Sequence, residues 1–153
     1  MNDKDDASEI NDYSKDIEDL FISFMMSNKD LFVRCKGIIK SGYFDDKQNR
    51  DTVAFIEGYS TSFSIIPSLD EIRAVTKKDI RIMEVDAAVH DKWFLREFEK
   101  FCKHKALRDA ILASPEMLDQ GRYGEVEATI KAAVQIALVK DLGLDYFLDP
   151  KSR

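Results

Sequence analysis

The stretch that decides the fold is Asp91–Lys140, DKWFLREFEKFCKHKALRDAILASPEMLDQGRYGEVEATIKAAVQIALVK. Its first half, Asp91–Ser114, runs for about six helical turns without a glycine or a proline. At 100° per residue, one broad face is apolar and holds Phe94, Leu95, Phe98, Phe101, Cys102, Leu112 and Ala113. This pattern predicts a long amphipathic helix.

The opposite side of this helix is basic, and three large apolar side chains interrupt it. The basic residues are Lys92, Arg96, Lys100, Lys103 and His104, and the apolar ones are Trp93, Leu107 and Ile111. Two explanations for the apolar residues stay open: a neighbouring loop covers them, or they contact a partner such as a second subunit. The basic stripe is either a solvated face or a contact for an acidic partner or for phosphates.

A connection rich in helix breakers leads to a return helix over Gly124–Lys140. Pro115 is expected to end or kink the first helix, because proline is favoured at the first position of a new one. One stripe of the return helix, expected to pack against the first helix, holds Val126, Ile130, Ala133, Val134, Ala137 and Leu138; Ala128, Ala132, Ile136 and Val139 make the other side apolar. A helix that is apolar nearly all round should be buried on both sides. One hairpin cannot bury both, so the sequence predicts self-association.

Composition bounds the class of protein. The chain has 153 residues, 44% of them hydrophobic, which suits one folded domain. Residues 1–19 hold eight acidic and two basic side chains and account for the whole net charge of −6, so residues 1–13 are expected to form an acidic, disordered tail. The neutral remainder argues against a nucleic-acid surface built on bulk charge. No apolar run is long enough to span a membrane and no signal-peptide pattern appears, so we expect a cytoplasmic protein with reduced cysteines.

Shorter helical patterns predict a globular helical subdomain over residues 14–89. Helices are expected over about 14–27, 28–40, 47–62 and 69–76, with Ser14 and Asn28 as caps and a capping box at Ser68 and Glu71. A further short helix is expected within residues 77–89, from Ile80, Ile82, Met83 and Val85. The predicted fold class is all-α: a globular bundle of short helices, then a long antiparallel helical hairpin over residues 90–140.

No group of residues has the pattern of an active site. Gly37 and Gly42 have the spacing of a phosphate loop, but Tyr43 and Phe44 stand where lysine and serine or threonine are needed. Cys102 and His104 point about 160° apart on a helix and cannot share a metal ion. Glu97 and Glu99 are separated in the same way and make no catalytic pair. We therefore expect no enzymatic activity, no cofactor and no metal site within this chain.

Taken together, the hairpin and the segment after it resemble the N-terminal domain of DnaB-like replicative DNA helicases, in the tailed-phage branch. The residues that carry the resemblance are Trp93-x-Leu95-x-x-x-x-Glu99-Lys100-Phe101, Lys105-Ala106-Leu107-x-x-Ala110-Ile111, Ser114-x-x-Met117-Leu118-Asp119, Ala133, Ala137-Leu138 and Gly143-x-Asp145-Tyr146-Phe147-x-Asp149-x-x-x-Arg153. Upstream, Phe44, the third helix and Ile66-Pro67-Ser68-Leu69 follow the family's order. The resemblance covers about Leu20–Arg153. It departs from the phage pattern at Leu144, where a polar residue is common, and in the short turn Gln120–Gly124.

The resemblance implies a non-catalytic collar domain that supports assembly of the helicase ring and docks primase and the helicase loader. Residues 141–153 would begin a linker to an ATPase domain that this chain lacks, and ATP and Mg²⁺ would belong to that domain. The implied hairpin core is Phe94, Phe98 and Phe101 with Val126, Ile130 and Ala137. The implied interface between subunits is Trp93, Leu107, Ile111, Ile136 and Val139.

Other functions stay open beside the collar. One is a stand-alone all-α phage adaptor that binds a host helicase or primase. Another is a small helical DNA-binding protein that uses the basic stripe. The collar function predicts a dimer, trimer or hexamer in solution, with only weak or indirect contact between this domain and DNA.

Overall fold

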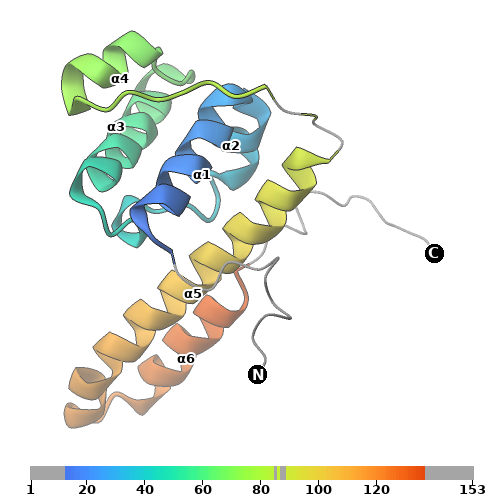
Figure 1. Ribbon diagram of the computed structural model, residues 1–153. Coiled ribbons are helices and arrows are strands. Elements are labelled where there is room, and N and C mark those ends of the chain that lie inside the picture. The colour runs from blue at the N-terminus through green and yellow to red at the C-terminus, as the bar shows by residue number, and fades with distance from the viewer. Residues whose placement is uncertain (1–12, 85, 87–88, 137–153) are drawn as a thin grey trace.

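The computed structural model describes residues 13–84, 86 and 89–136, and over these residues it contains helices and no strands. The elements are α1 (Lys15–Ser27), α2 (Lys29–Cys35), the 3₁₀ turn η2 (Ser41–Tyr43), α3 (Lys47–Phe63), α4 (Leu69–Thr76), α5 (His90–Asp119) and α6 (Tyr123–Val134). In Figure 1, α1 lies beside the first half of α5, α3 and α4 lie farther from α5, and α6 runs back along its second half. The predicted fold class, a bundle of short helices followed by a long helical hairpin, is confirmed.

An aromatic core joins α1 to the first half of α5. The ring of Phe21 lies 5.3–5.8 Å, centroid to centroid, from the rings of Phe94, Phe98 and Phe101, in each case nearly edge to face. Phe24 stacks on Phe94 at 5.1 Å. These are the favourable arrangements for aromatic pairs. The first half of α5 is therefore part of the globular core, and the sequence boundary at residue 90 does not divide two separately packed units.

The ends of the helices in the bundle follow their capping residues. Asn28 Oδ1 accepts the backbone N–H of Asp30 at 3.1 Å. Ser68 and Glu71 form the predicted capping box, with bonds of 3.1 and 2.8 Å. Ser14 stands at the N-cap of α1, as predicted, but its side chain makes no capping hydrogen bond.

The second helix is shorter than predicted, because it ends at Cys35 rather than near residue 40. The carbonyl of Cys35 accepts the N–H groups of both Ile38 and Ile39, at 3.0 and 2.9 Å, which closes the chain into a turn beside Gly37. Ile39 is nevertheless buried and Ile38 partly so. The apolar pattern identified buried positions correctly, but not the backbone that buries them.

The helix predicted within residues 77–89 is wrong for the part that the structure describes. Lys77 takes a left-handed conformation, with φ of 66°, and ends α4. The chain then runs without helix along α1, held by Lys78 Nζ on Asp19 at 2.7 Å and by Met83 N on Ser27 Oγ at 2.8 Å. Ile80 and Met83 pack against the core from this non-helical segment. Their three-residue spacing is compatible with a helix, but here it arises without one.

Pro115 does not end the long helix, since α5 continues to Asp119. A kink at Pro115, the other outcome expected from the sequence, stays a prediction. The proline removes one backbone hydrogen bond, and packing against α6 outweighs that loss because tertiary contacts supply most of a helix's stability. The chain turns away from the helix axis at Gly121, two residues after the helix ends, with φ of 73°. The N–H groups of Gly121 and Arg122 bond the carbonyls of Leu118 and Met117, at 3.0 and 2.9 Å, in a Schellman motif.

Candidate functional site

The long helix α5 changes neighbours along its length, and this decides which of its side chains are free. Its first half buries Phe94, Phe98 and Phe101 completely, against α1 and Phe44. Its second half packs on α6, where Ala110 of α5 and Ala133 of α6 are buried. The predicted packing of these three phenylalanines inside the hairpin is therefore wrong. They lie on the buried face of α5, as predicted, but on its first half, which packs against α1 rather than against α6.

The rest of the predicted hairpin core is only partly described. Val126 and Ile130 are half-buried on α6, and neither packs against the aromatic core. Ala137 lies outside the described residues. The buried residue of α6 is Ala133, which the sequence also placed on the stripe against the first helix.

The hairpin carries five exposed large apolar side chains, which we call the hairpin surface: Ile111, Leu112, Leu118, Tyr123 and Val134. Leu112 is 71% exposed and Tyr123 67%. The sequence interpretation placed Leu112 and Val134 on buried stripes. The structure exposes both. Large apolar side chains left exposed on both helices of one hairpin make it a candidate interaction site.

The residues predicted for the subunit interface divide between the core and this surface. Ile111 belongs to the hairpin surface and is 58% exposed. Trp93 is half-buried beside Phe24, with ring centroids 6.0 Å apart, and Ile136 also packs against the core. Leu107 is half-buried, and Val139 lies outside the described residues. Trp93 and Ile136 thus already have partners within one chain, and Ile111 is the most accessible of the four described residues of the set.

The basic stripe along α5 is partly neutralised by acidic neighbours on the same helix. Glu97 is fully buried, and its carboxylate lies 3.1 Å from Arg96 and 3.5 Å from Lys100. Lys103 lies 3.9 Å from Glu99. Lys92 is exposed at the start of α5. Three of the four predicted partner-binding cations are therefore engaged within the helix, which weakens the case for an anion-binding stripe.

A groove of about 590 Å³ lies between the hairpin and the chain around η2. Gly37, Ile38, Lys40 and Tyr43 line one side, Ala106, Asp109 and Ala110 come from α5, Ala128, Thr129, Ala132 and Ala133 come from α6, and Ile136 follows just after α6. We call it the alanine groove. Its volume lies within the range of ligand-binding pockets, roughly 300–1,000 Å³. Spacing along each helix could not have revealed it, because its walls come from three separate parts of the chain.

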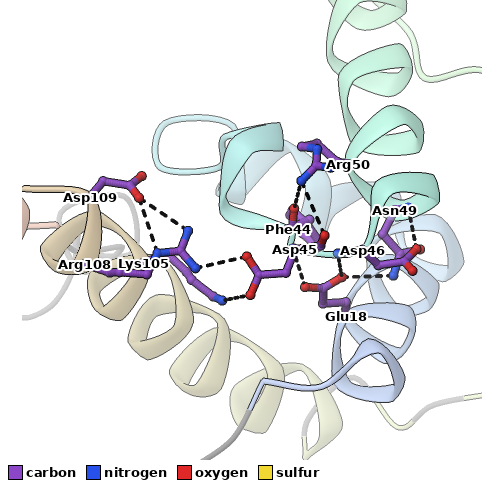
Figure 2. A network of polar contacts seen from close by, with 9 residues as sticks. All are labelled: Glu18, Phe44, Asp45, Asp46, Asn49, Arg50, Lys105, Arg108 and Asp109. Atoms are coloured by element: carbon purple, nitrogen blue, oxygen red, sulfur yellow. Dashed lines mark hydrogen bonds and ion pairs between the residues drawn. The ribbon is translucent and has the colours of Figure 1, made fainter. Parts of the chain in front are cut away.

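A polar network around the turn Phe44–Asp46 ties the hairpin to the bundle (Figure 2). The carboxylate of Asp45 accepts Lys105 Nζ at 2.7 Å and Arg108 at 3.0 Å, both from α5. From the other side, the buried carboxylate of Glu18 accepts the backbone N–H groups of Asp45 and Asp46, at 2.7 and 3.3 Å. The turn is thus held between α1 and α5, and it fixes the chain that forms one wall of the alanine groove.

The network also sets the charge state of Asp45. Burial alone would raise the pKa of this carboxyl group, but the hydrogen bonds from Lys105 and Arg108 outweigh burial and hold the pKa below its ordinary value. Lys105 is almost fully buried, and its ammonium also lies 5.6 Å from the centre of the Phe101 ring. A buried cation in this position needs the Asp45 carboxylate as its counter-charge. These contacts are those of a structural ion pair.

Two kinds of reactive group, metal-binding clusters and activated thiols, bear on whether the described residues could catalyse a reaction. Among them, no three histidine, cysteine, aspartate or glutamate side chains are placed to hold a metal ion. Burial raises the pKa of the Cys102 thiol well above its ordinary value, so it is not an activated nucleophile. What the arrangement provides is surface for contact with other molecules, on the hairpin and in the alanine groove.

Within the described part of the chain, no helix is both long and apolar enough to cross a bilayer. Comparison of the chain with models of protein families, with curated proteins and with solved structures gives no match.

Proposed function

We propose that this chain is the non-catalytic N-terminal collar domain of a phage replicative DNA helicase of the DnaB-like kind. In this role the hairpin pairs with the hairpin of another subunit, and the domain supports ring assembly and docks primase or the helicase loader during DNA replication. The ATPase chemistry would belong to a separate motor domain.

The observation that carries the proposal is the hairpin surface. Five large apolar side chains lie exposed on a hairpin whose second helix packs mainly on α5 and has a single buried residue, Ala133. Covering such a surface with the same surface of a second copy gives a two-fold, self-complementary contact. The order of elements, a helical bundle followed by a hairpin that extends from it, is also the order that the family resemblance implies.

The test is solution mass by light scattering over a concentration series, with the Ile111→Glu variant beside the natural chain. We expect a dimer or a larger species that dissociates on dilution, and a dissociation constant at least tenfold higher in the variant, because the new charge would be buried on pairing. Val75→Glu is the matched control, since Val75 is also β-branched, also on a helix and also 58% exposed. It should leave the mass unchanged.

Two results would overturn the assembly role. One is a monomer at every concentration, which would favour the adaptor function instead. The other is an equal effect of Ile111→Glu and Val75→Glu, which would mean that added charge, rather than loss of the hairpin surface, disrupts the assembly. Circular dichroism of both variants should match that of the natural chain, so that a change in mass reflects lost association rather than unfolding.

A further inference from the structure

The alanine groove has walls shaped for a helix. Its α6 wall runs from Ala128 to Ala133, about 7.5 Å or nearly one and a half helical turns at 1.5 Å per residue, and Ile136 extends this wall just beyond the end of the helix. Six of its lining residues are glycine or alanine, which let the backbone or a bulky side chain of a partner come close. A short amphipathic helix laid along such a groove places an apolar residue on it at every third or fourth position.

The charged residues at the groove indicate whether the partner helix is acidic or basic. Two charged residues line it, Asp109 and Lys40. Asp109 is neutralised by Arg108, whose guanidinium lies 3.3 Å from its carboxylate. Lys40 is exposed and forms no ion pair within the described residues, and a second exposed lysine, Lys36, directly precedes the lining residue Gly37. The unpaired charge at the groove is thus positive, although the chain as a whole carries −6.

We propose that the alanine groove binds an acidic amphipathic helix of a partner protein. Bulky apolar side chains of that helix would fill the space between α6 and the chain from Gly37 to Tyr43, and one of its carboxylates would pair with Lys40. The proposal does not depend on the collar function, because the groove and the hairpin surface share no residue. A negative result for the collar function would therefore not contradict helix binding by the groove, and the reverse also holds.

The experiment measures binding of two designed peptides to the full chain by fluorescence anisotropy. Each is an N-acetylated helix of about 14 residues with leucines at every third or fourth position. One carries glutamates beside the leucines and the other carries lysines at the same places. We expect the glutamate peptide to bind saturably and at least tenfold more tightly than its lysine twin, and the difference to shrink in high salt.

Two variants assign the binding to the groove. Ala132→Phe fills it and should weaken the glutamate peptide at least tenfold; Ala132 is exposed, so the larger ring does not disturb the core. Lys40→Glu should reverse the preference, so that the lysine peptide binds the more tightly. The matched controls are Ala74→Phe, at an exposed position on α4, and Lys29→Glu, at an exposed position on α2. Both should bind as the natural chain does.

Three results would overturn the proposal. The first is no saturable binding of the glutamate peptide. The second is binding of both peptides alike, with no change in Lys40→Glu. The third is a change in the mass of the chain in Ala132→Phe, which would mean that a second copy, rather than another protein, fills the groove.

Discussion

Glu18 and Asp45 show how single residues join parts of this chain that are far apart in sequence. Glu18 belongs to α1 and is 1% exposed, yet its carboxylate bonds the backbone of residues 27 and 28 positions later. Asp45 in turn bonds two side chains of α5, 60 and 63 positions further on. Along the sequence alone, Glu18 is one of several acids on a polar helix face and Asp45 is a turn residue. Nothing in helical periodicity separates them from acids that face water.

Asp45→Asn tests this turn at the residue scale. Because the pKa of Asp45 lies below its ordinary value of 3.8 in the folded chain, its ion pairs stabilise the fold above about pH 4 and are lost as the pH falls through the folded-state value. The variant leaves Lys105 buried without its counter-charge. We expect it to lower the free energy of unfolding at pH 7 by about 1–2 kcal/mol, between the values for exposed and buried ion pairs, since Asp45 itself is more than half exposed.

The measurement is urea unfolding between pH 7 and about pH 2. Stability of the natural chain should fall more steeply than that of Asp45→Asn at the acid end. The control is Asp51→Asn, which removes an i,i+4 pair with Lys47, a lysine that is 80% exposed where Lys105 is 5% exposed; it should change stability by less than about 0.5 kcal/mol. Equal pH dependence in the natural chain and in Asp45→Asn would show that the turn contributes nothing to acid sensitivity.

The helices themselves could largely be predicted from the sequence. The periodic apolar face of α5, the capping box of α4 and the Asn28 cap all depend on local chemistry, and all are present. What could not be predicted is how far along α5 the neighbouring helices of the bundle extend. Phe98 and Leu112 share one face of α5, but Phe98 meets α1 whereas Leu112 lies beyond the bundle. The hairpin surface and the alanine groove depend on this three-dimensional information, and so the candidate site was only partly foreseen, through Ile111 and Ile136.

Gly121→Ala tests the element that turns α5 back into α6. The left-handed φ of 73° at this position suits glycine, and a side chain there should lower the free energy of unfolding by about 1 kcal/mol. Gly124→Ala is the matched control, since it lies within the first turn of α6 and a Cβ meets no atom within 4 Å at either position. It should instead stabilise the chain, by up to about 1 kcal/mol. Urea unfolding of both variants measures the two effects, and effects of the same sign would contradict the assignment of the turn to Gly121.

The whole molecule combines a well-packed bundle with a lightly packed hairpin. The aromatic core ties α1 to the first half of α5, whereas α6 buries only Ala133 within the chain. Free energies of local opening follow such differences in burial. The hairpin should therefore open more readily than the bundle in a single chain, and pairing with a partner would be its main source of further stability.

Hydrogen exchange in the Ile111→Glu background, where pairing through the hairpin surface is removed, tests this division. We expect amides of α6 to exchange faster than those of α1, because α6 can separate from α5 without breaking the aromatic core. Phe98→Ala in the same background should lower the free energy of unfolding by about 3–5 kcal/mol, the usual effect of emptying a buried phenylalanine site. It should speed exchange in α1 and in the first half of α5, while α6, already exchanging through its own opening, changes little. If α6 instead exchanged as slowly as α1, and Phe98→Ala accelerated both equally, hairpin and bundle would unfold as one unit, and the hairpin would need no partner to be stable.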